Sequence, residues 1–410
     1  MRVLYCTDTW PPQVNGVSVV TALSVDGLRD RGWETHVIAP RYADPPRDAA
    51  TAAAAAAAAT ERATPGDSTR GIGITSLPSL QFPLYADVRL SAPDIAAIGD
   101  VVARFRPDLV HCATEFVIGR LGQLVARRAG IPVVSSYHTD FGKYAAAYGF
   151  PWLAGTVRRY VGRFHARAER TYTPSSVSAA EVSRLGARRA IVWGRGVDIA
   201  AFTPVRRSAR WRHDRLDSDD AFTVLHVGRL APEKSVEVVL DAFARASQAR
   251  PDLPLRLVVA GAGPSEAKLR NRSQGRVTWL GNLDRATELP SLYASCDCFA
   301  FASTTETLGL VVLEAMASGL PVIAVPAGGV SDHLRHLHNG VAVGAADVGA
   351  FAQAIIALAD DAALRRRLAE GALATARALD WSRELDVLDA SYRELCAESR
   401  VRLPAIPAVC

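Results

Sequence analysis

The sequence has few cysteines, and none of them forms a Cys-x-x-Cys pair or a cysteine–histidine group with the spacing of a zinc site. This excludes a zinc finger. Polar residues appear within residues 1–10, too early for the apolar stretch of a secretory leader. Unpaired cysteines are typical of a reducing compartment. We therefore expect a cytoplasmic protein. Cys296 and Cys298 are then expected to fill an apolar core. No apolar run approaches the roughly 20 residues of a membrane-spanning helix.

The length of the chain and its proportions of hydrophobic and charged residues are those of a large globular protein. The 410 residues exceed the roughly 250–300 at which a single core stops growing, so two domains are expected. The net charge of +5 favours polyanionic partners. Because no nucleic-acid-binding motif is present, we expect phosphorylated ligands or anionic lipid, and no nucleic acid.

Alternating strand and helix patterns run through both halves and predict an α/β fold of two doubly wound, Rossmann-like domains facing a cleft. The predicted strands are 2–6, 35–39, 72–77, 109–111, 133–137, 171–174, 190–192, 222–227, 256–260, 277–280, 298–302 and 321–325. The predicted helices are 17–31, 95–104, 122–129, 235–249, 265–272, 289–295 and 309–318, with a mostly helical region at 348–396.

Breaks in these patterns indicate the domain limits. Residues 1–205 form the expected N-terminal, acceptor-side domain, and 206–375 the expected donor domain. Residues 376–410 are expected to be helical and to pack back toward the N-terminal domain. The segment 42–70, which contains a run of alanines, has no apolar stripe and is predicted to be a flexible surface insertion. The domain junction is placed in the charged, turn-rich segment 202–220.

The segment 303–325 carries the strongest chemical pattern. A strand ends in a polar turn, and a helix then begins near Leu308 or Gly309, whose free backbone N–H groups form an anion site. Glu306 is expected in the turn, and Glu314 on the helix below it. Two acids beside a phosphate-binding helix start suit a ligand with hydroxyl groups around a phosphate, such as a nucleotide sugar. Taken alone, each acid is better explained without a ligand, as an acid at a helix N-terminus or as a solvated glutamate on a helix.

A second pattern lies in residues 224–243. The predicted strand ends in Gly228, and Arg229 and Lys234 then project from one loop. A guanidinium fork and a compact ammonium together can neutralise a diphosphate. The alternative is a basic loop that faces solvent.

Two weaker signals come from the N-terminal half. Gly16 precedes the first helix and allows a phosphate to approach its backbone N–H. His138 follows a predicted strand at its carboxyl end, where ligand contacts belong, and Asp140 and Lys143 lie close by. A structural histidine is the alternative.

Two tempting motifs are set aside. Residues 261–266 resemble half of a dinucleotide fingerprint, but Glu266 stands where the third glycine belongs. Asp217 and Asp219 form an Asp-x-Asp pair in the charged junction without a flanking strand, so no metal site is predicted.

Taken together, these segments resemble the family-four retaining glycosyltransferases with the GT-B fold, over nearly the whole chain. The resemblance includes the glycine loop before the first helix, the histidine segment, the Glu-x7-Glu pair, and three short motifs. These motifs are GRGVD at 194–198, GRLAPEK at 228–234 and GAGP at 261–264. Their joint order is specific for the family and less so for the substrate.

The resemblance implies roles for the matching positions. Arg229 and Lys234 would bind the donor diphosphate, and backbone at Gly16 and at Leu308 and Gly309, with Thr307 beside them, would complete the donor site. Glu306 would contact hydroxyl groups of the transferred sugar, Glu314 the ribose, and His138 the sugar near its anomeric carbon. Such enzymes usually need no metal or cofactor.

Donor and acceptor rest on resemblance to bacterial mannosyltransferases and sulfoquinovosyltransferase-like enzymes that glycosylate lipids. GDP-mannose is the first expectation, and UDP-glucose or another UDP-sugar the second. Residues 148–170 combine aromatic residues with five arginines, which suits either an anionic membrane surface or a solvated basic helix. We therefore expect a lipid-linked or glycan acceptor and a peripheral membrane location. A sugar-nucleotide epimerase, a nicotinamide-dependent oxidoreductase and a non-enzymatic nucleotide-sugar-binding protein are the alternatives.

Overall fold

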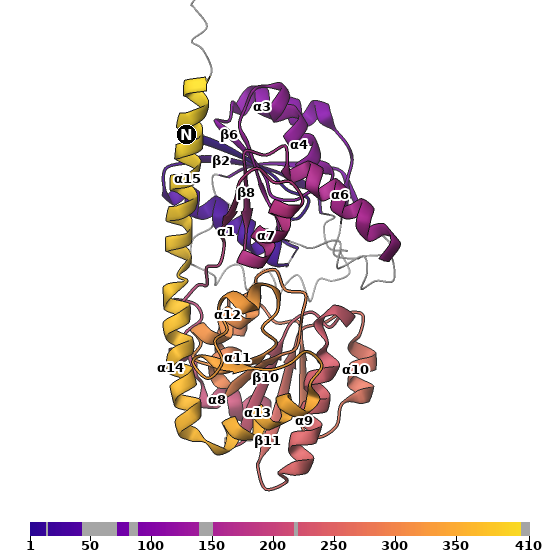
Figure 1. Ribbon diagram of the computed structural model, residues 1–410, viewed down its shortest axis with the longest axis vertical. Coiled ribbons are helices and arrows are strands. Elements are labelled where there is room, and N and C mark those ends of the chain that lie inside the picture. Colours follow the sequence, from indigo (N-terminus) through magenta and orange to yellow (C-terminus); the bar gives the residue numbers. More distant parts are fainter. Residues whose placement is uncertain (14, 43–71, 82–88, 139–150, 217–219, 403–410) are drawn as a thin grey trace, which may run out of the picture.

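Two α/β domains are stacked along the long axis of the molecule (Figure 1). The structure is a computed structural model, and it describes residues 1–13, 15–42, 72–81, 89–138, 151–216 and 220–402. Each domain is built around its own parallel sheet, one of seven strands and one of six. The predicted fold class, with two doubly wound domains, is therefore confirmed.

The N-terminal sheet consists of β1 (Arg2–Cys6), β2 (Glu34–Pro40), β3 (Gly73–Leu77), β6 (Leu109–Cys112), β7 (Val133–Ser136), β8 (Arg170–Thr173) and β9 (Ala190–Val192). Helices α1 (Gly16–Asp30), α3 (Ile95–Phe105), α4 (Val117–Arg128), α6 (Ala154–His165) and α7 (Ser176–Arg184) connect them. The strand order is β3-β2-β1-β6-β7-β8-β9, with parallel pairing throughout. The order reverses beside β1, which places a ligand-binding switch point at its carboxyl end.

The C-terminal sheet consists of β10 (Phe222–Val227), β11 (Leu255–Ala260), β12 (Val277–Gly281), β13 (Cys298–Phe301), β14 (Val322–Ala324) and β15 (Gly340–Ala342). Its helices are α9 (Val236–Ala249), α10 (Glu266–Arg272), α11 (Leu289–Ser295), α12 (Leu310–Ala317), α13 (Val348–Asp360) and α14 (Ala362–Ala378). The order β12-β11-β10-β13-β14-β15 reverses beside β10. Helices cover both faces, so the strands are continuous apolar runs. Cys296 and Cys298 are buried in this core, as predicted.

The last helix, α15 (Trp381–Arg402), connects the two domains. In Figure 1, α14 and α15 (yellow) run along one side of both domains. Tyr392 of α15 is fully buried against the N-terminal sheet, where its hydroxyl lies 3.0 Å from the Tyr5 hydroxyl and also contacts His111. The end of the chain therefore completes the core of the domain in which the chain begins.

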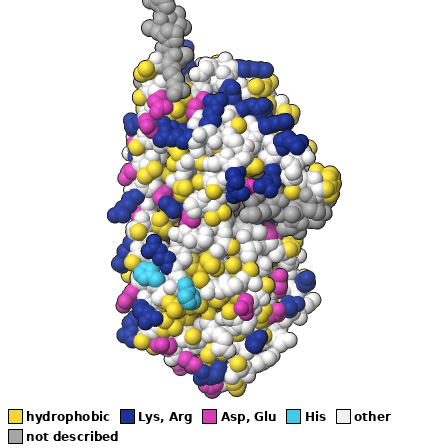
Figure 2. Space-filling view, in the orientation of Figure 1, with side chains coloured by type: hydrophobic (Ala, Val, Ile, Leu, Met, Phe, Trp, Pro, Cys, Tyr) yellow, Lys and Arg dark blue, Asp and Glu magenta, His cyan; other side chains and the backbone are white. Residues whose placement is uncertain are grey.

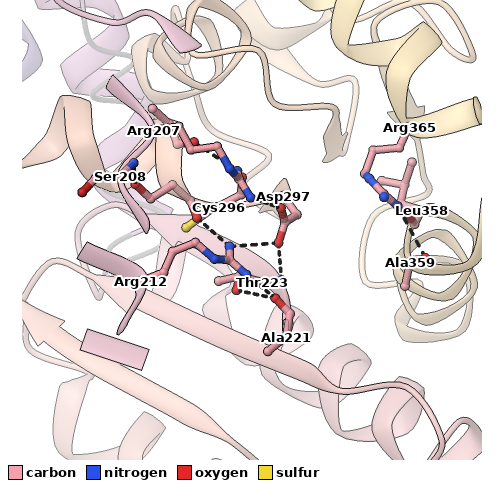
Figure 3. A network of polar contacts seen from close by, with 12 residues as sticks. Arg207, Ser208, Arg212, Ala221, Thr223, Cys296, Asp297, Leu358, Ala359 and Arg365 are labelled. Atoms are coloured by element: carbon pink, nitrogen blue, oxygen red, sulfur yellow. Dashed lines mark hydrogen bonds and ion pairs between the residues drawn. The ribbon is translucent and has the colours of Figure 1, made fainter. Parts of the chain in front are cut away.

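The charged junction is more ordered than its composition indicates. It contains α8 (Ala209–Leu216), whose Arg212 is buried beneath the C-terminal sheet. Figure 3 shows Arg207 and Arg212 converging on Asp297, at 2.9 and 3.2 Å. Arg212 also donates to the carbonyl of Ala221 at 2.6 Å. These buried partners turn a segment predicted as linker into a folded part of the C-terminal domain.

Other differences from prediction concern short or boundary elements. Helix α4 begins at Val117, five residues before the prediction. Helix α7, strand β15 and the hairpin of β4 (Ser79–Gln81) and β5 (Arg89–Ser91) were not predicted. Tyr42, taken as the first residue of the insertion, donates to Gln13 at 3.1 Å and accepts from the Trp10 N–H at 2.9 Å, so it belongs to the folded domain. The remainder of that insertion lies outside the described residues.

Candidate active site

Loops at the carboxyl edge of the C-terminal sheet touch through their backbones. The Leu230 N–H donates to the Ala262 carbonyl at 3.0 Å, which joins the loop after β10 to the loop after β11. A Cβ on Gly261, whose φ is +127°, would lie 2.0 Å from the Gly228 carbonyl oxygen, so glycine is required here. The glycines at 261 and 263, which do not form a dinucleotide fingerprint, therefore allow the loops to pack closely.

Lys234 and Glu306 meet between these loops and the loop after β13. Lys234 ends the 3-10 helix η4 (Pro232–Lys234), and Ser235, with φ of +50°, turns the chain into α9. The Lys234 Nζ lies 2.5 Å from Glu306 Oε1, and both side chains are 15% exposed. Partial burial strengthens the attraction by lowering the effective dielectric constant.

Arg229 lies on the same loop as Lys234, as the sequence placed it. Its Nη1 is 4.0 Å from Glu233 Oε1, at the outer limit of an ion pair. The Arg229 side chain is 27% exposed, whereas Glu233 is buried. The guanidinium therefore keeps an exposed side for a ligand while an acid behind it fixes its position.

The turn from Glu306 to Gly309 is held by the loop after β14. The Gly329 N–H donates to the Glu306 carbonyl at 2.8 Å, and a Cβ on Gly328 would lie 2.0 Å from that oxygen. Leu308 is buried in the core. Gly309, with φ of +77°, begins α12 without a side-chain cap. The first N–H groups of α12 are therefore available to an anion.

His138 joins this turn from the other domain. It lies two residues after the end of β7, and its backbone carbonyl accepts a hydrogen bond from Thr307 Oγ1 at 2.5 Å. Nearby, the Asp332 carboxylate accepts from the Ser176 N–H at 2.7 Å. We call these two contacts the interdomain seam. Burial, helped by the nearby His165, lowers the pKa of His138 to about 4, so its ring is neutral near pH 7.

Glu314 lies on α12, and its carboxylate is already engaged. Oε1 accepts from Arg285 Nε at 3.0 Å and from Nη2 at 2.7 Å, and Oε2 accepts from the Tyr293 hydroxyl at 3.1 Å. The residue is 2% exposed, and burial raises the pKa of its carboxyl above the usual value. A ribose that reaches Glu314 directly therefore has to displace Arg285 or share Oε2 with Tyr293.

Gly16, which belongs to the N-terminal domain, is the first residue of α1. Asn15 caps this helix by accepting from the Ser18 N–H at 2.9 Å. Nothing lies within 4 Å of the point where a Cβ on Gly16 would project. The space beside Gly16 is therefore open, whereas Gly261 and Gly309 are enclosed.

Three residues near these loops, the buried His226 and His333 and the partly exposed Arg285, were not singled out from the sequence. His226 on β10 donates from Nδ1 to the Ala300 carbonyl at 3.0 Å, and its Nε2 has no partner among the described residues. Neither ring nitrogen of His333 has one there either. Arg285, the partner of Glu314, lies in the loop after β12. His226 lies near the end of β10 and Arg285 in the loop after β12, and these positions were the available signal, but their partners Ala300 and Glu314 lie far away in sequence.

Four other residues weighed from the sequence, Asp140, Lys143, Asp217 and Asp219, lie outside the described residues. The arginine-rich segment is described from residue 151 onward, and most of it forms α6. In the part of the chain that the structure describes, no helix is both long enough and apolar enough to cross a membrane.

Comparison with known proteins places this geometry in a family. Residues 14–201 match the family model "Glycosyltransferase Family 4", and residues 221–361 match "Glycosyl transferases group 1". The chain is 33% identical over 404 residues to the GDP-mannose-dependent alpha-mannosyltransferase of Mycolicibacterium smegmatis, covering 98% of this chain and 100% of that one. It is 34% identical over 276 residues to the sulfoquinovosyl transferase SQD2 of Arabidopsis thaliana, covering 66% and 52%.

The fold is shared with solved structures. The Anabaena HepE protein in complex with UDP and glucose superimposes with a TM-score of 0.72 at 21% identity, covering 98% of this chain and 100% of that one. Such a likeness concerns the fold, which is the two-domain GT-B arrangement. Together with the matches along both halves, it identifies the chain as a member of the family-four glycosyltransferases, which act on a nucleotide-sugar donor.

Proposed function

We propose that this enzyme is a retaining, metal-independent hexosyltransferase that moves mannose from GDP-mannose to a lipid-linked or glycan acceptor. The observation that carries the proposal is the Lys234–Glu306 pair, which lies next to Thr307, whose hydroxyl donates to the His138 backbone carbonyl at the interdomain seam. The proposal assigns the cation to phosphate, the acid to hydroxyl groups of the sugar, and the neutral imidazole of the residue across the seam to the sugar.

The charges account for departure of the nucleotide. As the bond between the anomeric carbon and the phosphate oxygen breaks, the diphosphate gains negative charge. In the proposal, Lys234, Arg229 and the first N–H groups of α12 stabilise that charge; the two cations lie on one loop, and α12 begins without a side-chain cap. Binding of the diphosphate to Lys234 frees Glu306 to accept hydrogen bonds from the sugar.

Retention follows if attack and departure occur on the same face of the sugar. The acceptor hydroxyl forms the new bond to the anomeric carbon, and its proton passes to the departing phosphate oxygen. Glu306 is paired with Lys234, and Glu314 is buried against Arg285, so neither is placed as a free nucleophile. The neutral His138 ring is suited to a hydrogen bond with the sugar.

The mycobacterial relative supports GDP-mannose, because it is aligned over its whole length and its name specifies that donor. The UDP and glucose bound in HepE keep a UDP-sugar as the second candidate.

A thermal-shift panel of GDP, UDP, GDP-mannose and UDP-glucose, with and without magnesium, tests the donor. A ligand at a hundred times its dissociation constant adds about 2.7 kcal/mol of stability. We expect the guanine nucleotides to raise the melting temperature equally in magnesium and in EDTA. A shift that requires magnesium contradicts metal independence, and no shift with any nucleotide contradicts the proposal as a whole.

An arginine cluster on α4 and α6 supports an acceptor at an anionic membrane. Arg127 Nη1 donates to the Arg167 carbonyl at 3.3 Å, and Arg167 Nη1 donates to the Arg163 carbonyl at 3.4 Å. Desolvation, together with the charges of Arg120, Arg127 and Arg163, lowers the pKa of Arg167. Among the described residues, no carboxylate forms an ion pair with any of the four. Figure 2 shows the dark-blue side chains gathering over this part of the N-terminal domain.

Sedimentation with vesicles of phosphatidylglycerol tests this surface. The double variant Arg163→Gln/Arg167→Gln should lose most of the bound fraction, because each basic residue near an anionic surface contributes about 1 kcal/mol. Arg366→Gln/Arg367→Gln, on α14, is the matched control. Equal sedimentation of both double variants, or none by the wild-type protein, contradicts membrane association.

A further inference from the structure

The ion pair between the partly exposed Arg285 and the buried Glu314 lies beside the expected phosphate site but has no part in the chemistry above. Arg285 follows β12, and Gly281 at the end of β12 accepts from the Gly261 N–H at 2.7 Å. The loops after β10, β11 and β12 thus form one continuous edge. Through Glu314, the Arg285 guanidinium is tied to α12, the helix whose N-terminus is available to the diphosphate. A nucleotide bound at that helix therefore places its nucleoside within the same group of loops.

Arg285 is held by Glu314, and most of its N–H donors have no partner among the residues that the structure describes. A guanidinium has five N–H donors, and two of them bind Glu314 Oε1, which leaves three. The group lies 5.2 Å from the ring centroid of Phe202, and 27% of the side chain is exposed. An arginine that recognises a ligand needs a fixed orientation, N–H donors that are not used within the protein, and an exposed edge.

Glu314 holds this arginine in place. It is 2% exposed, and both of its oxygens already accept hydrogen bonds. Removing Arg285 would leave a buried carboxylate without its counter-charge, which is costly. The two side chains therefore act as one unit, with the guanidinium as the part that a ligand meets.

We propose that Arg285, positioned by Glu314, is a donor-specificity residue that contacts the nucleoside of the nucleotide sugar and favours guanine over uracil. The inference rests on the proposed function, because it needs a nucleotide at α12. Guanine presents O6 and N7 side by side as acceptors, and an arginine fork binds both. Uracil has no such pair of adjacent acceptors, since an N–H donor separates its two carbonyl oxygens.

Dissociation constants for GDP and UDP, measured by calorimetry, test the proposal. Arg285→Lys keeps a positive charge for Glu314 but loses the planar fork, so it should fold, and Arg285→Met removes both. We expect Arg285→Lys to weaken GDP binding about tenfold and UDP binding less than about threefold. The ratio of the two dissociation constants should thus move toward one.

Arg270 supplies the matched control. Its Nε and Nη2 bind Glu266 Oε1 at 2.9 and 2.8 Å, and its guanidinium lies 4.9 Å from the ring centroid of Trp279, in the same arrangement. Arg270→Lys should leave the ratio unchanged. An unchanged ratio in Arg285→Lys overturns this inference alone, whereas a wild-type preference for UDP overturns both the inference and GDP-mannose as the proposed donor. Wild-type protein that binds neither nucleotide overturns the proposed function, and the inference with it.

Discussion

At the scale of single residues, Lys234 carries the sharpest expectation. Lys234→Ala removes the cation that faces the departing diphosphate and leaves Glu306 without its partner. We expect kcat to fall about 10²–10³-fold, as for loss of one preorganised electrostatic contact. The measurement is steady-state transfer of mannose from GDP-mannose, with circular dichroism to verify the fold.

Lys268→Ala is the control, because this exposed lysine lies on α10 away from the loops described above. Its kcat should match that of the wild-type enzyme. If Lys234→Ala also keeps the wild-type rate, Lys234 does not belong to the donor site.

The role of Glu314 can be decided with a modified ligand. If Glu314 acts only by holding Arg285, Glu314→Gln should weaken GDP and 2′,3′-dideoxy-GDP by the same factor, because the ribose hydroxyl groups are not involved. If Glu314 binds the ribose, the loss should vanish with the dideoxy nucleotide. Calorimetric dissociation constants for both nucleotides measure this, and we expect equal losses.

The sequence predicts the site residues whose positions follow from the local pattern of strands and helices, but not the contacts between loops that are distant in sequence. Lys234, Glu306 and Gly309 stand at strand ends or helix starts, and such positions are readable from pattern alone. That Lys234 pairs with Glu306, or Glu314 with Arg285, follows from strand order, which places sequence-distant loops side by side. One sequence does not contain that order.

At the scale of elements, long apolar strands and amphipathic helices were the predictable part. The segment of helix α8 was interpreted as a linker because it is rich in arginine, and the sequence does not distinguish the buried Arg212 from its exposed neighbours. The partner that stabilises Arg212, Asp297, lies far away in sequence, next to strand β13. Strands β4 and β15 have three residues each, and so short a segment shows little periodicity, although β9 was predicted at the same length. Tertiary contacts, rather than local preference, decide such elements.

Helix α15 belongs to the N-terminal core through Tyr392. Tyr392→Ala should lower the free energy of unfolding by about 3–5 kcal/mol, because it leaves a cavity among buried rings. Tyr392→Phe should cost less, about 1–3 kcal/mol, since it only strips Tyr5 and His111 of a partner. Urea denaturation followed by circular dichroism gives both values.

Val387→Ala, at a half-exposed position of the same helix, should change stability by less than about 0.5 kcal/mol. If Tyr392→Ala is equally mild, α15 contributes little to the N-terminal core.

At the scale of the whole molecule, several contacts join the domains. The Ser176 N–H and Oγ both donate to Asp332, at 2.7 and 2.5 Å, and Thr307 donates to His138. Arg195 Nη1 also lies 3.8 Å from the Asp332 carboxylate, and Tyr392 of α15 contacts Tyr5 of the N-terminal sheet. The turn that contains Glu306 is therefore held against the backbone of His138.

Buried neutral histidines make the whole molecule sensitive to acid. Burial lowers the pKa of His226 and His333 to about 4 and that of His111 to about 3, from a usual value of 6.5. Between pH 6.5 and about 4 the unfolded chain binds protons that the folded chain does not, so stability falls as the pH falls. Each histidine contributes up to about 1.4 kcal/mol per pH unit in that window.

His333→Leu isolates one of these terms, because the side chain is buried and neither ring nitrogen has a partner among the described residues. The melting temperature should fall less steeply between pH 6.5 and 4.5 in this variant than in the wild-type protein, as scanning calorimetry would measure. Asp8 and Glu314 have raised pKa values and act in the opposite direction, but both are common to the two proteins. Identical slopes would mean that His333 is protonated in the folded state, so the space beside Gly309 would have to accommodate a charge.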